Sequence, residues 1–127
     1  MRAFGNLKKN AVSAIPALIN TIKDKQNSKS IVRAAAGTLQ KIDSIIAIPY
    51  IVKNISDKNK NFSGSWTRLL QDAVNEIKRN KNDLSQAELS KVISELETVL
   101  KIIESYENDF PQHIAPFLRK SIAELKK

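Results

Sequence analysis

Few side chains in this sequence could perform catalysis or hold a metal ion. The chain has no cysteine and one histidine, His113, which lies close to a proline at an expected helix start. A zinc site needs several Cys, His or carboxylate ligands, so the usual zinc constellations are excluded. The three glycines are isolated, and no glycine-rich phosphate loop is present. We therefore expect a protein that is not an enzyme and needs no cofactor, in which His113 has a surface or capping role.

Positive charge is the strongest chemical signal, and it is unevenly distributed. The net charge is +8. Residues 1–60 contain 11 Lys and Arg against 3 Asp, whereas residues 61–127 contain 10 Lys and Arg against 10 Asp and Glu. The whole excess therefore belongs to the N-terminal half. Such an excess favours an acidic partner, whether protein, nucleic acid or lipid headgroup, although a charged face can also serve solubility alone.

Length and composition indicate one helical domain. A chain of 127 residues with 42% hydrophobic and 27% charged residues falls in the globular range rather than the disordered one. Its β-branched residues are mixed with Ala, Leu, Lys and Glu, and Gly and Pro are rare, so helices are favoured over strands. No apolar run reaches the roughly 20 residues of a membrane-spanning helix, and the N-terminus lacks a signal-peptide pattern. We expect a cytoplasmic protein.

A repeat with an offset of 33 residues runs through the N-terminal half. Residues 14–25 (AIPALINTIKDK) align with residues 47–58 (AIPYIVKNISDK). Each copy places a proline, Pro16 or Pro49, just inside an expected helix start, where its missing N–H costs nothing. Pro116 begins a weaker third copy. Apolar residues follow each proline at helical spacing, so each copy predicts the amphipathic first helix of a helix pair.

A second helix is expected after each first helix. Residues 31–42 form an alanine-rich helix whose predicted N-cap is Ser28 or Ser30, and residues 66–77 are its counterpart in the next unit. Gly37 lies on the first of these helices. We expect its small size to admit a neighbouring helix closely.

Proline-started first helices, a polar turn with Asp and the sequence Val-Arg-Ala-Ala-Ala-Gly over residues 32–37 resemble HEAT-type repeats, particularly the short HEAT-like variety of phycobilisome lyases. The resemblance covers about residues 1–77, with a truncated first unit because residues 3–9 match the middle of a second helix. It implies an all-α fold in which residues 1–80 form a right-handed α-solenoid within a single domain, residues 1–127. It also implies a non-enzymatic protein-interaction scaffold and, by analogy alone, an accessory role in phycobilin attachment.

The pattern changes in the C-terminal third of the chain. Ser85 and Glu88 form an expected capping box at the start of a long helix that ends at about Glu107. Its apolar residues recur at near-heptad spacing: Leu89, Val92, Ile93, Leu96, Val99, Leu100, Ile103 and Tyr106. A last helix is expected to start at Pro116. We expect residues 83–127 to form a helical hairpin that covers the end of the solenoid, with a coiled coil to another chain as the alternative.

The candidate binding surface follows from the HEAT resemblance, because such arrays expose a concave face formed by their second helices. On that face we expect these partner-binding residues: Lys29, Arg33, Gln40, Lys41, Arg68, Asp72 and Asn75. A structural role is the alternative for Arg33, since in this repeat type such an arginine often pairs with a turn aspartate, here Asp24 or Asp57. Trp66 is expected between units, with an exposed anchor as the alternative.

The expected partner is an acidic protein, bound by the basic N-terminal half. Nucleic acid is the alternative, through a strip of cations that could neutralise phosphates. These are Lys8, Lys9, Lys23, Lys25, Lys29, Arg33, Lys41, Lys53, Lys58 and Lys60. Few arginines and almost no interleaved aromatics disfavour base recognition. Because the leading unit lacks its first helix, residues 1–7 also predict self-association through the N-terminal end, or an origin within a longer array.

Overall fold

The computed structural model describes residues 13–56, 64–106 and 110–127, and within them the protein is all-helical, as predicted. The α-helices are α2 (Ile15–Lys23), α3 (Lys29–Ile42), α4 (Ser44–Ser56), α5 (Gly64–Arg79), α6 (Gln86–Ser105) and α7 (Ile114–Lys126), with one 3₁₀ helix, η1 (Lys81–Asp83), before α6. Each of these described helices is too short or too polar to cross a lipid bilayer.

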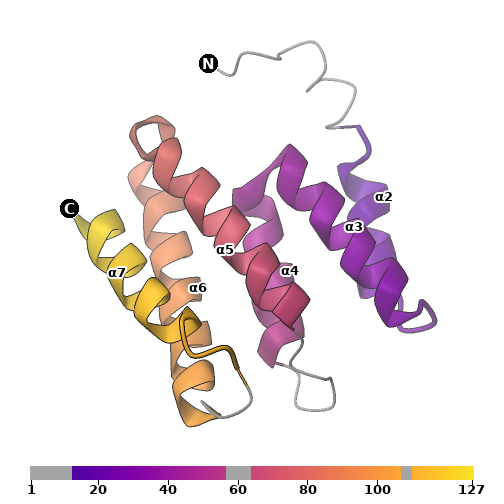
Figure 1. The fold of residues 1–127 in the computed structure, drawn as a ribbon. Helices are drawn as coiled ribbons and strands as arrows, with labels where there is room; N and C mark the ends of the chain where they lie inside the picture. Colours follow the sequence, from indigo (N-terminus) through magenta and orange to yellow (C-terminus); the bar gives the residue numbers. More distant parts are fainter. Residues whose placement is uncertain (1–12, 57–63, 107–109) are drawn as a thin grey trace.

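The helices lie in two layers, with α3, α5 and α7 nearer to the viewer in Figure 1 and α2, α4 and α6 behind them. Consecutive helices pack in pairs, α2 with α3, α4 with α5, and α6 with α7. Neighbouring pairs contact each other through α3 and α4, α4 and α6, α3 and α5, and α5 and α7. The central helix is therefore α4, which contacts α3, α5 and α6.

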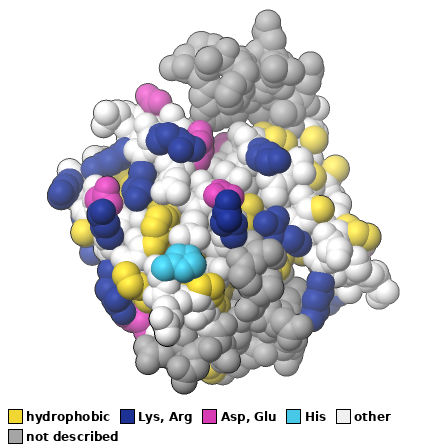
Figure 2. Space-filling model, viewed as in Figure 1, with side chains coloured by type: hydrophobic (Ala, Val, Ile, Leu, Met, Phe, Trp, Pro, Cys, Tyr) yellow, Lys and Arg dark blue, Asp and Glu magenta, His cyan; other side chains and the backbone are white. Residues whose placement is uncertain are grey.

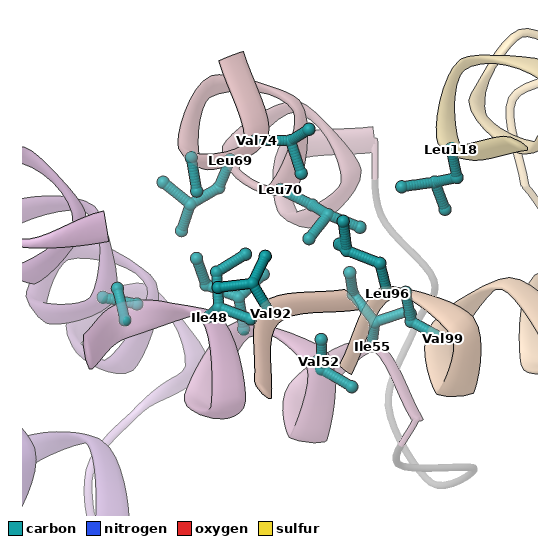
Figure 3. Packing of buried hydrophobic residues seen from close by; sticks show 14 of the residues in the cluster. Ile48, Val52, Ile55, Leu69, Leu70, Val74, Val92, Leu96, Val99 and Leu118 are labelled. Atoms are coloured by element: carbon teal, nitrogen blue, oxygen red, sulfur yellow. The ribbon is translucent and has the colours of Figure 1, made fainter. Parts of the chain in front are cut away.

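Apolar side chains from four helices meet in the core shown in Figure 3. The labelled residues come from α4 (Ile48, Val52, Ile55), α5 (Leu69, Leu70, Val74), α6 (Val92, Leu96, Val99) and α7 (Leu118). Each of them is at most 4% exposed. Burying such a side chain fully contributes about 1.5–3 kcal/mol, so this cluster contributes strongly to the stability of the fold. By contrast, Ile22 is the buried residue of α2.

Side-chain caps define the starts of α3 and α6. The Ser28 Oγ accepts a hydrogen bond from the Ile31 N–H at 3.3 Å, which confirms Ser28 rather than Ser30 as the N-cap. The Ser85 Oγ accepts from the Glu88 N–H at 3.1 Å, and Glu88 Oε1 accepts from the Ser85 N–H at 2.9 Å. The predicted capping box is thereby confirmed.

The first helix of the second pair begins earlier than its proline predicts. Pro49 was expected just inside the start, but α4 begins at Ser44 and contains Pro49 in its interior. The reason is Asp43, whose Oδ1 accepts hydrogen bonds from the N–H groups of Ile45 at 3.0 Å and Ile46 at 3.2 Å. This cap satisfies donors that have no partner within the helix, so the helix starts there. Pro49 then leaves the Ile45 carbonyl without its usual helical donor.

The other two prolines lie in the first turns of their helices. Pro16 directly follows the first residue of α2, as predicted. Pro116 is the third residue of α7, which begins at Ile114, so the start predicted at this proline was wrong by two residues. Proline fits both places because the first N–H groups of a helix have no carbonyl partner within it.

The apolar stripe predicted for α6 is buried except at its end. Val92, Leu96, Val99 and Ile103 are buried, and Leu89, Ile93 and Leu100 are half-buried against the core. Tyr106 was predicted to join this stripe but is 37% exposed, because the helix ends at Ser105 and Tyr106 serves as its C-cap. The predicted end at Glu107 lies outside the described residues.

Candidate partner-binding surface

The predicted binding residues all lie on α3 and α5, in the layer that faces the viewer in Figure 2. Lys29, Arg33, Gln40 and Lys41 belong to α3, and Arg68, Asp72 and Asn75 belong to α5. Lys and Arg side chains are spread over this face, with fewer Asp and Glu among them (Figure 2). Lys29, Lys41, Arg68 and Asp72 are exposed, and Arg33, Gln40 and Asn75 are partly buried. The structure therefore places the seven residues on two adjacent helices of one layer.

Arg33 and Trp66 connect α3 to α5. The guanidinium carbon of Arg33 lies 5.9 Å from the centroid of the Trp66 ring, within the range of a cation–π contact. Trp66 is half-buried and packs against the core, which agrees with its expected place between units. The contact joins residues from two different helix pairs and could not be read from spacing along the chain.

Because Gly37 has no side chain, the Arg33 side chain has space to lie next to it on α3. A Cβ atom at position 37 would lie 2.9 Å from Arg33 Nη1, which is closer than such atoms approach in proteins. Outside the backbone of α3 itself, no other described atom would come within 4 Å of that Cβ. Among the described residues, no neighbouring helix occupies the space that Gly37 leaves. A side chain of its own helix occupies the space instead.

Asp24 is one of the two aspartates expected to pair with Arg33. Its side chain accepts a hydrogen bond within its own turn. Its Oδ1 accepts a hydrogen bond from the Gln26 N–H at 2.9 Å. Asp57, the other expected partner, lies outside the described residues. The same holds for Lys8, Lys9, Lys58 and Lys60 of the predicted strip, and for residues 1–7, on which the self-association prediction rests.

Gln40 is used within the fold. Its Nε2 donates to Ser44 Oγ at 3.0 Å, and that hydroxyl donates to the Gln40 carbonyl at 3.1 Å. These residues, with Lys41, Glu76 and Asn80, line a pocket of about 40 Å³ between α3 and α5. That volume holds only a few water molecules. Gln40 therefore positions the end of α3, while the exposed Lys41 remains accessible at the rim.

Arg68 and Asp72 largely offset each other. Their Nε and Oδ1 atoms lie 3.8 Å apart, and the two side chains are 76% and 53% exposed. Such an exposed pair, four residues apart on a helix, contributes only about 0.3–0.5 kcal/mol. This part of α5 therefore presents polar groups but no net charge, and Asn75 adds a half-buried amide beside it.

The helices α2, α3 and α4 contain no Asp or Glu at all. The two acidic residues in the turns between them, Asp24 and Asp43, both accept backbone N–H groups. Within the described residues, every ion pair lies instead in α5 to α7. These pairs are Arg68–Asp72, Lys78–Glu124, Arg79–Glu76, Arg119–Glu104 and Lys126–Glu97.

Three cations of α3 follow one another along the helix, and we call Lys29, Arg33 and Lys41 the α3 basic stripe. Their spacing is four and then eight residues, with Gly37 in the middle of the longer interval. Each step of four residues turns by about 40° around a helix, so the stripe winds by about 120° from Lys29 to Lys41 while it spans about 18 Å. The sequence alone carried this signal, in the regular spacing and in the absence of acidic residues, but the Arg33–Trp66 contact needed the structure.

Other chemistry has no visible basis in the part of the chain that the structure describes. There, no three His, Asp or Glu side chains gather closely enough to hold a metal ion. His113 is exposed, and its Nε2 lies 3.4 Å from Gln71 Oε1, which links α7 to α5. It lies at the N-cap position of α7 but makes no capping hydrogen bond with its side chain.

Comparison with known proteins gives no relatives. No model of a known protein family matches the chain, and neither curated proteins nor solved structures show a significant match. Any statement about function therefore rests on the residues and contacts described above.

Proposed function

We propose that this protein is a non-enzymatic scaffold of HEAT-like helix pairs that binds an acidic segment of another protein through its basic N-terminal half. The observation that carries the proposal is the lack of acidic residues in α2 to α4. Three successive helices have cations and no acidic residue, and the nearby aspartates Asp24 and Asp43 serve as backbone caps.

The charge has an energetic consequence that favours a partner. Like charges four residues apart, such as Lys29 and Arg33, destabilise a helix by about 0.2–0.5 kcal/mol. Carboxylates supplied by another chain would relieve this repulsion. Complementary charge also raises association rates and selects against basic partners. An acidic protein segment is thus the ligand that this half of the chain is best suited to recognise.

The contact pattern supports the array part of the proposal. Each helix pair packs mainly on the next pair, as in a short stack of repeats. The last pair carries ion pairs between its two helices, from Glu104 to Arg119 and from Glu97 to Lys126. A polar outer face of this kind is what the terminal unit of a repeat array requires.

Nucleic acid is less well matched to the same surface. Proteins that bind single strands stack bases on exposed aromatic rings. Trp66 is the aromatic residue next to the basic stripe, and the Arg33 guanidinium already lies over its ring. Duplex DNA could bind only through contacts between the cations and its phosphates. The affinity of such binding falls steeply as the salt concentration rises.

The test is fluorescence anisotropy with a labelled oligoglutamate peptide of about ten residues, which is long enough to span the stripe. The full chain is titrated at about 50 mM and about 200 mM salt, beside oligoglutamine, duplex DNA and single-stranded RNA. We expect oligoglutamate to bind and oligoglutamine not to bind. Tighter binding of either nucleic acid than of oligoglutamate at the higher salt would overturn the proposal.

A matched pair of variants locates the interaction. The double variant Lys29→Glu/Lys41→Glu should weaken oligoglutamate binding roughly 30-fold, since about 1 kcal/mol is lost at each site. Lys91→Glu/Lys101→Glu makes the same change of net charge on α6, where acidic residues are already present. It should change the affinity only about twofold, through long-range charge.

A further inference from the structure

We infer that the acidic segment bound by this protein is an amphipathic helix whose apolar side docks on Ile31, at the open edge of α2 and α3. This inference rests on the proposed function and deepens it, because it names the shape of the acidic partner. Three features of the described residues carry it. They are an exposed apolar side chain, a neighbouring helix with little buried surface, and exposed cations at the same end of the helix pair.

Ile31 is the most exposed large apolar side chain among the described residues, at 49%. It lies one turn before Ala35, which is buried, so it belongs to the apolar side of α3. Two residues turn a helix by about 200°, and Arg33 lies against Trp66 of α5, so Ile31 is on the side of α3 away from α5. The apolar side of α3 therefore extends to an edge that the described helices leave half open.

The neighbouring helix α2 leaves further apolar surface at this edge. Its buried residue is Ile22, whereas Ile15, Leu18 and Ile19 on the same side of the helix are only half-buried. Figure 1 shows α2 and α5 on opposite sides of α3, and a short turn joins the end of α2 to the start of α3. Ile31 and the half-buried residues of α2 thus form one apolar strip at this end of the molecule.

Cations surround the start of this strip. Lys23, Lys25 and Lys29 lie in the last turn of α2, in the connecting turn and at the start of α3, and all three are exposed. None of them forms an ion pair within the described residues. The acidic residue among them, Asp24, accepts a backbone N–H of its own turn. An apolar strip beside cations is complementary to a ligand that has apolar residues on one side and carboxylates at their margin.

A helix matches this edge better than an extended segment does. A helix satisfies its own backbone N–H and C=O groups, so it can lie on an apolar strip without outside partners. An extended segment needs the edge of a sheet for those groups, and the described residues contain no strand. An anionic bilayer is a weaker match, because Ile15, Leu18 and Ile19 are already half-buried and are more accessible to the side chains of a narrow helix than to a flat surface.

The test is fluorescence anisotropy of the full chain with a labelled peptide of about 14 residues, which has Leu at three-residue and four-residue spacing and Glu or Ala elsewhere. A permuted peptide of the same composition, without that spacing, is the control. We expect the amphipathic peptide to bind about tenfold more tightly than the permuted one. It should also gain helical circular dichroism on binding, and the permuted peptide should not.

Ile31→Lys separates apolar docking from charge. The variant adds a cation but removes the apolar contact, so binding of the amphipathic peptide should weaken about fivefold while binding of oligoglutamate is unchanged or tighter. Ile31→Thr removes apolar surface without adding charge and should weaken binding of the amphipathic peptide about threefold. Ser94→Lys adds the same charge at an exposed position of α6 and should leave this binding within about twofold. Thermal unfolding of each variant verifies that it folds.

The outcomes distinguish the docked helix from the proposed function. Equal binding of the amphipathic and permuted peptides, or tighter binding of the amphipathic peptide to Ile31→Lys, would overturn the docked helix and keep the acidic partner. Absence of binding of oligoglutamate and of both peptides at about 50 mM and about 200 mM salt would overturn both. Sedimentation with phosphatidylserine vesicles that is lost in Ile31→Thr, without binding of any peptide, would replace the acidic protein by a lipid surface.

Discussion

The two halves of the molecule share a plan of paired helices but use charge differently. In α5 to α7, cations meet carboxylates, and three of the five ion pairs found among the described residues connect different helices. In α2 to α4, the helices have no carboxylate, and the neighbouring aspartates cap helix or turn N–H groups. The comparison teaches that cations of α5 to α7 connect helices through carboxylates, and that α2 to α4 contain no carboxylates for such contacts.

Lys78 shows how a cation is used in the C-terminal half. Its Nζ lies 5.1 Å from the centroid of the Phe117 ring, donates to Ser121 Oγ at 3.3 Å, and lies 3.5 Å from Glu124 Oε1. Its side chain is only 24% exposed. Three residues of α7 thus meet one lysine of α5, whereas the exposed Lys41 of α3 makes no ion pair within the described residues.

Among the substitutions that test this difference between the halves, Lys78→Ala should cause the largest loss of stability. Removing this ammonium leaves buried Ser121 without its donor and loses the contacts with Phe117 and Glu124, at a cost of about 2 kcal/mol. Urea unfolding monitored by circular dichroism measures the change. Lys41→Ala, the matched control in the other half, should change the free energy of unfolding by less than about 0.5 kcal/mol. Equal losses in the two variants would contradict the division between the halves.

A smaller effect is expected at Asp43. Asp43→Ala removes the acceptor of the Ile45 and Ile46 N–H groups and should cost about 1 kcal/mol. Asp43→Asn keeps an acceptor oxygen and should cost only a few tenths of a kcal/mol, since asparagine is an equally good cap. The same unfolding assay applies. A loss for Asn as large as that for Ala would mean that the charge of Asp43, and not its capping, matters.

The smallest expected effect is an increase in stability when an acidic residue is introduced into α3. Ser30→Glu introduces a carboxylate in the first turn, three residues before Arg33, and should stabilise the protein by about 0.5 kcal/mol. Ser30→Gln is the neutral control and should lack this gain. Thermal unfolding at low salt measures both variants. Destabilisation by Ser30→Glu relative to Ser30→Gln would show that an added carboxylate does not stabilise α3, which would contradict this prediction.

Local signals in the sequence predicted much of the fold. Ser28 and Ser85 are caps whose partners lie three residues away, so short-range chemistry was enough to place them. The start of α4 was missed because two local signals compete there. The repeat favoured Pro49, but Asp43 offers two capping hydrogen bonds, while an interior proline removes only one helical hydrogen bond.

The candidate site was less predictable, for a different reason. The cations of α3 and their four-residue spacing are visible in the sequence, as is the lack of acidic residues. Trp66 lies 33 residues after Arg33, and only the packing of α5 beside α3 brings them together. Gly37 lies four residues after Arg33, but the chosen rotamer of Arg33 decides whether the two touch.

The contacts of α2 have a consequence for how the chain opens. Within the described residues, this nine-residue helix packs mainly on α3 and contributes Ile22 to the core, whereas each of the other α-helices contributes several buried apolar residues. Local unfolding free energies follow such differences, so we expect the amide protons of α2 to exchange faster than those of the helices with several buried residues. The helix that carries the basic stripe, α3, buries four apolar residues, so we expect its amide protons to exchange more slowly than those of α2. A ligand seated on α3 slows amide exchange first in α2 and α3, and the C-terminal hairpin scarcely responds.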